Sequence, residues 1–170
     1  MKEMFGGLPK WAQGVIAVTA VAGVAFIGYK AYKKIQESKS LKDSDQTAKD
    51  AKKELDKLYD KGQDLTHPKM VYQTASNSIV NSLDGCDSSS NEYDVVDTIK
   101  GVIKKPIDWY YLVQLFGSKL IDNCLWGAGE TPYALPELLK DQLGQFTRWN
   151  PTKTNYEDVQ EYLKKIGVTI

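Results

Sequence analysis

The chain has 170 residues, with 22 Lys or Arg and 22 Asp or Glu, and 42% of its residues are hydrophobic. This length suffices for one small domain and a connecting segment. The charge is uneven, because residues 30–66 hold ten lysines and eight acids whereas residues 67–170 hold ten basic residues and thirteen acids. The mildly acidic C-terminal part has no basic stripe interleaved with aromatics, so we expect no nucleic-acid partner.

The chain contains two cysteines, Cys86 and Cys124, and one histidine, His67. The cysteines form one disulfide in an oxidising compartment or remain two thiols in a reducing one, and the sequence leaves both states open. Two isolated cysteines and one histidine do not supply the four ligands of a structural zinc site. We therefore expect no metal of that kind and no cofactor.

A short tail, residues 1–10, precedes a stretch of nineteen residues without a charge, residues 11–29. A helix of nineteen residues is about 28 Å long, close to the hydrocarbon thickness of a bilayer. Trp11 and Tyr29 lie at its two ends, where aromatic rings meet the lipid headgroups. The sequence therefore predicts a transmembrane helix and a lipid bilayer as partner.

Lysines flank the predicted span at Lys30, Lys33 and Lys34. This flank favours a retained anchor over a cleaved signal peptide. The lysine bias places the C-terminal part on the cytoplasmic side of a bacterial inner membrane, or on the inner side of a virion membrane, and the reverse insertion stays open.

Small residues recur within the span, among them Gly14, Thr19 and Gly23. Thr19 and Gly23 form a small-xxx-small pair that allows close approach of a second helix. Self-association, packing on another membrane protein and a single lipid-facing helix are the alternatives.

Residues 30–65 are rich in Lys, Asp and Glu, with Ala51, Leu55 and Leu58 at helical spacing. Opposite charges lie three or four positions apart, which supports a helix in solvent. We expect a charged, solvated helical stalk that ends at Gly62. The small residues at its apolar positions disfavour a coiled coil.

Residues 66–170 predict an all-α domain, an orthogonal bundle of about five helices, with no strands. Apolar periodicity and capping signals give the helices and their ends. The expected helices are 68–83, a second starting at Ser89 with Glu92 in a capping box, a third capped by Asp108 and stopped by Gly117, a fourth over 135–143, and a last one starting at Thr154 with Glu157 and closed by Gly167. Residues 118–134 are expected to be irregular and pinned by buried apolar side chains.

The order of five motifs resembles an annexin-type repeat, and more narrowly an annexin-like module of uncharacterised bacteriophage and mobile-element proteins. The motifs are NSLDGCD (81–87), EYDVV (92–96), IDWYYLVQLFG (107–117), LPELLKDQL (135–143) and YLKKIGV (162–168). The resemblance covers about residues 68–168 and implies the same helical fold.

In annexins the loop between the first two helices offers oxygen ligands to calcium, a hard cation. The resemblance implies Asp84, Asp87 and Glu92 as calcium candidates here. The loop in this chain is longer and rich in serine. The alternative interpretation is a cluster of helix-capping side chains on a solvated turn.

No catalytic constellation is apparent. His67 has no nucleophile in its local sequence, and the surroundings of Glu130 and Glu137 lack the motifs of lytic transglycosylases. We therefore expect no enzyme.

The expected function is that of a single-pass membrane-anchored structural or adaptor protein, in its sharpest form a minor membrane protein of a lipid-containing phage virion that links membrane to protein shell. Its expected partners are the bilayer and other membrane proteins, capsid proteins or a second copy. One alternative is a membrane-tethered binding module of a bacterial envelope, responsive to calcium. A second is a cell-wall hydrolase.

Overall fold

The computed structural model describes residue 39 and residues 41–84, 89–122, 130–144, 146–147 and 150–170. The chain divides into two units, residues 1–39 and 40–170. The predicted tail and transmembrane helix, with the site residues from Trp11 to Lys34, lie outside the described ranges. Within these ranges no helix has the length and apolar character needed to cross a membrane.

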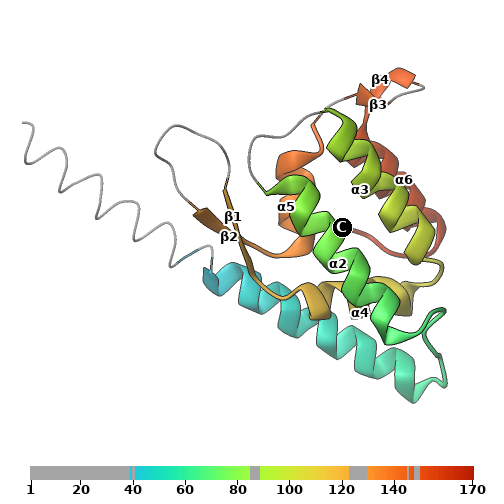
Figure 1. Ribbon diagram of the computed structural model, residues 1–170. Helices are drawn as coiled ribbons and strands as arrows, with labels where there is room; N and C mark the ends of the chain where they lie inside the picture. Colours follow the sequence, from blue (N-terminus) through green and yellow to red (C-terminus); the bar gives the residue numbers. More distant parts are fainter. Residues whose placement is uncertain (1–38, 40, 85–88, 123–129, 145, 148–149) are drawn as a thin grey trace, which may run out of the picture. The chain divides into compact units, whose positions relative to one another are not determined.

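The second unit is mostly helical (Figure 1). Its helices are the helix of residues 41–60, α2 (Lys69–Leu83), α3 (Ser89–Val102), α4 (Pro106–Phe116), α5 (Leu135–Gln142) and α6 (Asn155–Lys165). Its strands are β1 (Lys119–Asp122), β2 (Glu130–Tyr133), β3 (Phe146–Thr147) and β4 (Asn150–Thr154). The sequence predicted an all-α domain, and the mostly helical character of this unit is confirmed.

Several local signals at the helix ends act as predicted, although Asp108, predicted to cap the third helix, lies within the first turn of α4, whose N-cap is Lys105. The hydroxyl of Thr154 accepts the backbone N–H of Glu157 at 3.2 Å, and the Glu157 carboxylate accepts the backbone N–H of Thr154 at 2.7 Å, which completes the capping box of α6. Gly62, Gly117 and Gly167 have positive φ angles of 74°, 61° and 86°. Each follows a helix, because glycine adopts the left-handed conformation of a helix C-terminus without steric cost.

The expectation of no strands is wrong. Residues 118–134, predicted to be irregular, contain β1 and β2, which pair antiparallel with Leu120 opposite Pro132. A second antiparallel pair joins β3 and β4, which lie between α5 and α6. The sequences of β1, β2 and β4, KLID, ETPY and NPTKT, do not alternate apolar and polar residues, and β3 has only two residues, so the pattern by which a strand is recognised is missing.

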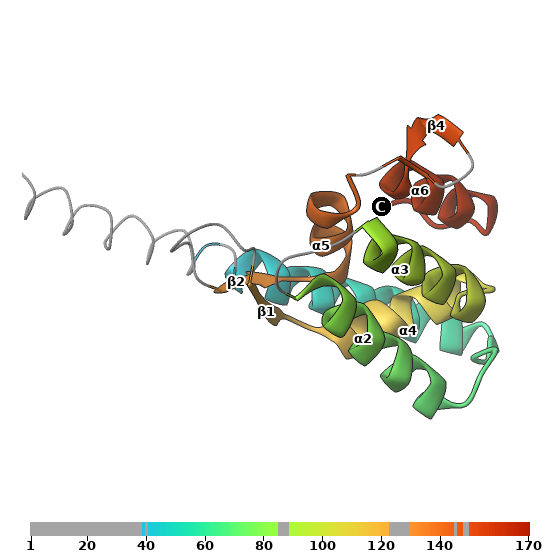
Figure 2. The ribbon, with the colours of Figure 1, turned by 45° about the horizontal axis from the view of Figure 1, so that its top comes forward.

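The core lies among the helices of residues 69–165. α2 packs against α3 and α4, α3 packs against α6, and α4 packs against α5 (Figures 1 and 2). The largest fully buried side chains come from α2, α3, α4 and α5, from the connection between α3 and α4, and from β1. They are Tyr72, Ile79, Leu83, Ile99, Ile103, Ile107, Leu112, Phe116, Ile121, Leu135, Leu138 and Leu139.

The helix of residues 41–60 differs from the predicted solvated stalk. It forms and ends as expected, but Ala51 and Leu55 are each only 5% exposed. The hydroxyl of Thr47 donates to Glu137 of α5 at 2.8 Å, and Ser44 donates to the carbonyl of Pro132 at 3.5 Å. This helix therefore joins the folded unit along one face, while its charged face remains in solvent.

Candidate functional site

The carboxylate of Asp108, fully buried in the first turn of α4, is the centre of a polar cluster. One oxygen accepts the backbone N–H of Thr66 at 2.9 Å and the hydroxyl of Tyr72. The other accepts the hydroxyl of Thr66 at 2.7 Å and the backbone N–H groups of Lys104 and Lys105 at 2.9 and 3.0 Å. Five donors thus converge on one carboxylate, which ties the turn after residue 60 to the start of α4.

Hydrogen bonds keep this carboxylate ionised. Burial by itself would raise the pKa of Asp108, but the donors from Thr66, Tyr72 and Lys104 together hold it below its ordinary value. Burial and the hydrogen bond to Asp108 raise the pKa of Tyr72. With all donors coming from this chain, the cluster is a structural clamp.

His67 borders the clamp. Its backbone N–H donates to the Tyr72 hydroxyl at 3.3 Å, and the two rings are 6.2 Å apart. Its Nε2 atom is buried and has no hydrogen-bond partner in the described part of the chain. The histidine therefore contributes to packing at the turn.

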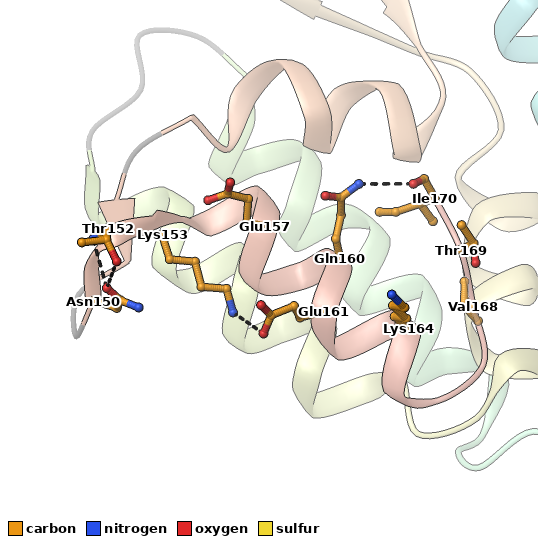
Figure 3. Close-up of a pocket in the computed structure, with 10 residues that line it drawn as sticks. All are labelled: Asn150, Thr152, Lys153, Glu157, Gln160, Glu161, Lys164, Val168, Thr169 and Ile170. Carbon is orange, nitrogen blue, oxygen red and sulfur yellow. Dashed lines mark hydrogen bonds and ion pairs between the residues drawn. The ribbon is translucent and has the colours of Figure 1, made fainter.

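A groove of about 610 Å³ lies between β4, α6 and the last residues of the chain (Figure 3). Its lining is mixed, with polar side chains of both charges beside apolar ones: Asn150, Thr152, Lys153, Glu157, Gln160, Glu161, Lys164, Val168, Thr169 and Ile170. Its carboxylates have partners within the chain, since Glu157 caps α6 and Glu161 pairs with Lys153 at 2.8 Å. The groove offers hydrogen-bonding groups for a ligand, and its described acids are held in structural interactions.

A second groove, of about 360 Å³, lies between the helix of residues 41–60 and α4. Thr47, Ala51 and Glu54 line one side, and Trp109 and Tyr110 line the other. Thr169 and Ile170 line both grooves, so the C-terminal residues form a shared wall. The sequence did not predict either groove, because the residues of each wall are far apart in the chain.

The calcium candidates lie in different surroundings. Asp84 is exposed and accepts the backbone N–H of Asp122 at 2.9 Å. Glu92 is only 3% exposed and accepts the side-chain amide of Asn155 at 3.0 Å. Asp87 lies outside the described residues, as do Cys86 and Cys124. Across the described ranges, no group of three or more His, Cys, Asp or Glu side chains is placed to hold a metal.

The two glutamates considered for hydrolysis, Glu130 and Glu137, have different surroundings. Glu130 is exposed at the start of β2, opposite Asp122. Glu137 lies in the first turn of α5, where one oxygen accepts the Thr47 hydroxyl and the other is buried without a hydrogen-bond partner among the described atoms. Glu137 thus helps to hold the helix of residues 41–60.

Comparison of the chain with protein families, with curated proteins and with solved structures yields no match. The annexin-like resemblance therefore stays a prediction, and the function is argued from this chain's own residues.

Proposed function

We propose that the protein is a single-pass membrane-anchored adaptor, in which residues 11–29 cross a bilayer and the helical unit binds a second component. The observation that carries this proposal is the packing of the helix of residues 41–60. Because Ser44, Ala51 and Leu55 are buried, the folded unit starts close behind the predicted anchor. A short connection of this kind keeps the helical unit close to the membrane.

The connecting segment limits the reach of the adaptor. Residues 30–40 number eleven, and a fully extended chain of that length spans at most roughly 40 Å. A solvated stalk over residues 30–65 would have allowed a much longer reach. The proposed adaptor therefore works in the layer next to the membrane.

The sharpest form of the proposal is a minor membrane protein of a lipid-containing phage virion that links its membrane to its protein shell. The annexin-like resemblance to phage proteins supports this form, and so do the two open grooves of the folded unit, which offer surfaces for a second component.

Membrane insertion is tested with the full chain and a double variant, Val18→Arg with Val21→Arg. Each arginine at the centre of a span costs about 2.5–3.5 kcal/mol on insertion scales. We expect the native chain to stay in alkali-extracted membranes and the variant to be released. The matched control, Asn77→Arg with Asn81→Arg, adds the same charge at exposed positions of α2 and should stay in the membrane. Release of the native chain by alkali would refute the anchor.

The virion form is tested on purified particles. Detergent extraction should release the protein with the lipid fraction, and cross-linking before extraction should retain it on the shell. Absence of the protein from both membrane and shell fractions would refute this form and leave the anchor itself to the extraction experiment.

A further inference from the structure

The turn of residues 61–68 and the connection between α3 and α4 meet at one end of the helical unit. The Asp108 carboxylate holds them together, since it accepts the backbone N–H groups of both Thr66 and Lys104. Figures 1 and 2 both show this turn and this connection at the same end of the unit, away from the β1–β2 hairpin.

Four exposed lysines, Lys61, Lys69, Lys104 and Lys105, surround this junction and are called the lysine patch. In the described part of the chain, none of the four forms an ion pair with a carboxylate. Their known contacts are to carbonyls, from Lys104 to Lys100 and from Lys105 to Asp64 at 3.4 Å. Of the other described lysines, Lys53, Lys57, Lys100 and Lys153 are paired with acids, whereas others, such as Lys42 and Lys140, form no ion pair within the described residues.

Helix stabilisation accounts for Lys61 and Lys104, which follow the C-terminal ends of the helix of residues 41–60 and of α3, but not for Lys69 and Lys105. Cations stabilise the C-terminal end of a helix and are unfavourable at its N-terminal end. Lys69 is the first residue of α2, whose first turn has no acid, and Lys105 directly precedes α4. The N-terminal dipole end of α2 therefore adds to the positive charge of the lysines, whereas the Asp108 carboxylate occupies that of α4.

Two large apolar side chains are exposed at the same end. Met70, 78% exposed, follows Lys69, and Tyr59, 39% exposed, accepts at its carbonyl the N–H of Gly62 in the turn. Methionine adapts to varied partner surfaces, and tyrosine is enriched where proteins bind one another. Apolar contacts within a charged rim are the arrangement of a protein interface.

We propose that the lysine patch, with Met70 and Tyr59, binds an acidic protein surface that carries apolar side chains. This proposal rests on the proposed function and names the partner-binding end of the adaptor. The patch fits a protein better than nucleic acid, because it lacks the arginine forks that match phosphates. Asp60 and Asp64, exposed in the same turn, would also repel a continuous phosphate backbone.

The test uses the full chain in nanodiscs of zwitterionic lipid, with empty nanodiscs as a blank, and a fluorescent peptide of alternating Leu–Glu pattern as the probe. Fluorescence anisotropy should show saturable binding that weakens as salt screens the lysines. Lys69→Glu with Lys105→Glu should weaken binding by about tenfold or more, since charge reversal replaces attraction by repulsion. Met70→Ala should weaken it by about threefold, through lost apolar contact.

The matched control is Lys42→Glu with Lys140→Glu, which reverses two exposed lysines outside the patch and should leave binding within about twofold. Three results would each overturn the proposal. The control variant could lose as much peptide binding as the patch variant, or polyglutamate without leucine could bind equally well. A DNA oligonucleotide could also bind more tightly than the peptide, with this binding abolished in the patch variant. Thermal unfolding of each variant shows that it is folded. If the chain resists alkaline extraction but does not bind the peptide, the patch alone is refuted. If alkali releases the chain from membranes but it still binds the peptide, the anchor alone is refuted.

Discussion

The helix of residues 41–60 and α4 line the same groove, yet they are held in different ways. α4 buries six of its eleven residues, whereas the longer helix buries three, Ser44, Ala51 and Leu55. One helix is part of the core, and the other is attached to it by a narrow apolar face. Since local stability follows buried contacts, we expect the helix of residues 41–60 to open before α4 does.

The largest expected effect comes from Asp108→Ala in α4. Five donors would lose their acceptor in a buried place, so we expect a loss of about 3–5 kcal/mol in the free energy of unfolding. Urea unfolding of the full chain measures it. Asp56→Ala, at an exposed position of the helix of residues 41–60, should change stability by less than about 0.5 kcal/mol. A similar small loss in both variants would show that the clamp does not stabilise α4.

Leu112→Ala removes a fully buried side chain from α4. We expect a loss of about 3 kcal/mol, from lost apolar burial and the cavity that remains. Leu115→Ala, at a half-buried position of the same helix, is the control and should cost clearly less. Equal losses in denaturant unfolding would contradict the burial that distinguishes the two positions.

Leu55→Ala weakens the narrow face of the helix of residues 41–60. We expect a loss of about 1–2 kcal/mol, because the site can relax towards solvent. Amide hydrogen exchange should speed up over residues 41–60 and stay slow in α4. Leu58→Ala, half-buried on the same helix, should have a weaker effect. Faster exchange in both helices together would mean that they open as one unit.

The smallest expected effect is a pH dependence from the clamp. Hydrogen bonds outweigh burial and hold the pKa of Asp108 below its ordinary value. A carboxyl with a lowered pKa contributes its full stabilisation above the unfolded value of about 3.9 and loses it as the pH falls through the folded pKa. In Asp108→Asn we expect the free energy of unfolding to fall less between neutral and acidic pH than in the native chain, because the titrating carboxyl is absent. Urea unfolding over this pH range measures the difference. Parallel profiles for the two proteins would contradict it.

Much of the fold follows from local sequence signals. The apolar spacing and caps that predicted the helices act over one or two turns, so Gly62, Gly117 and the Thr154 capping box have their predicted roles. Asp108 was predicted only as a helix cap. Its bonds to Thr66 and Tyr72 join residues 42 and 36 positions apart, which no local pattern reveals.

The sequence by itself therefore determined where the helices of the described unit form and end, because those choices depend on neighbours within a few residues. Only the tertiary structure decided that the apolar face of the helix of residues 41–60 is buried, how β1 meets β2 and which donors surround Asp108. These features arise from contacts between distant segments. Charge pairs such as that of Glu54 and Lys57 look alike in a solvated helix and in one packed along its other face.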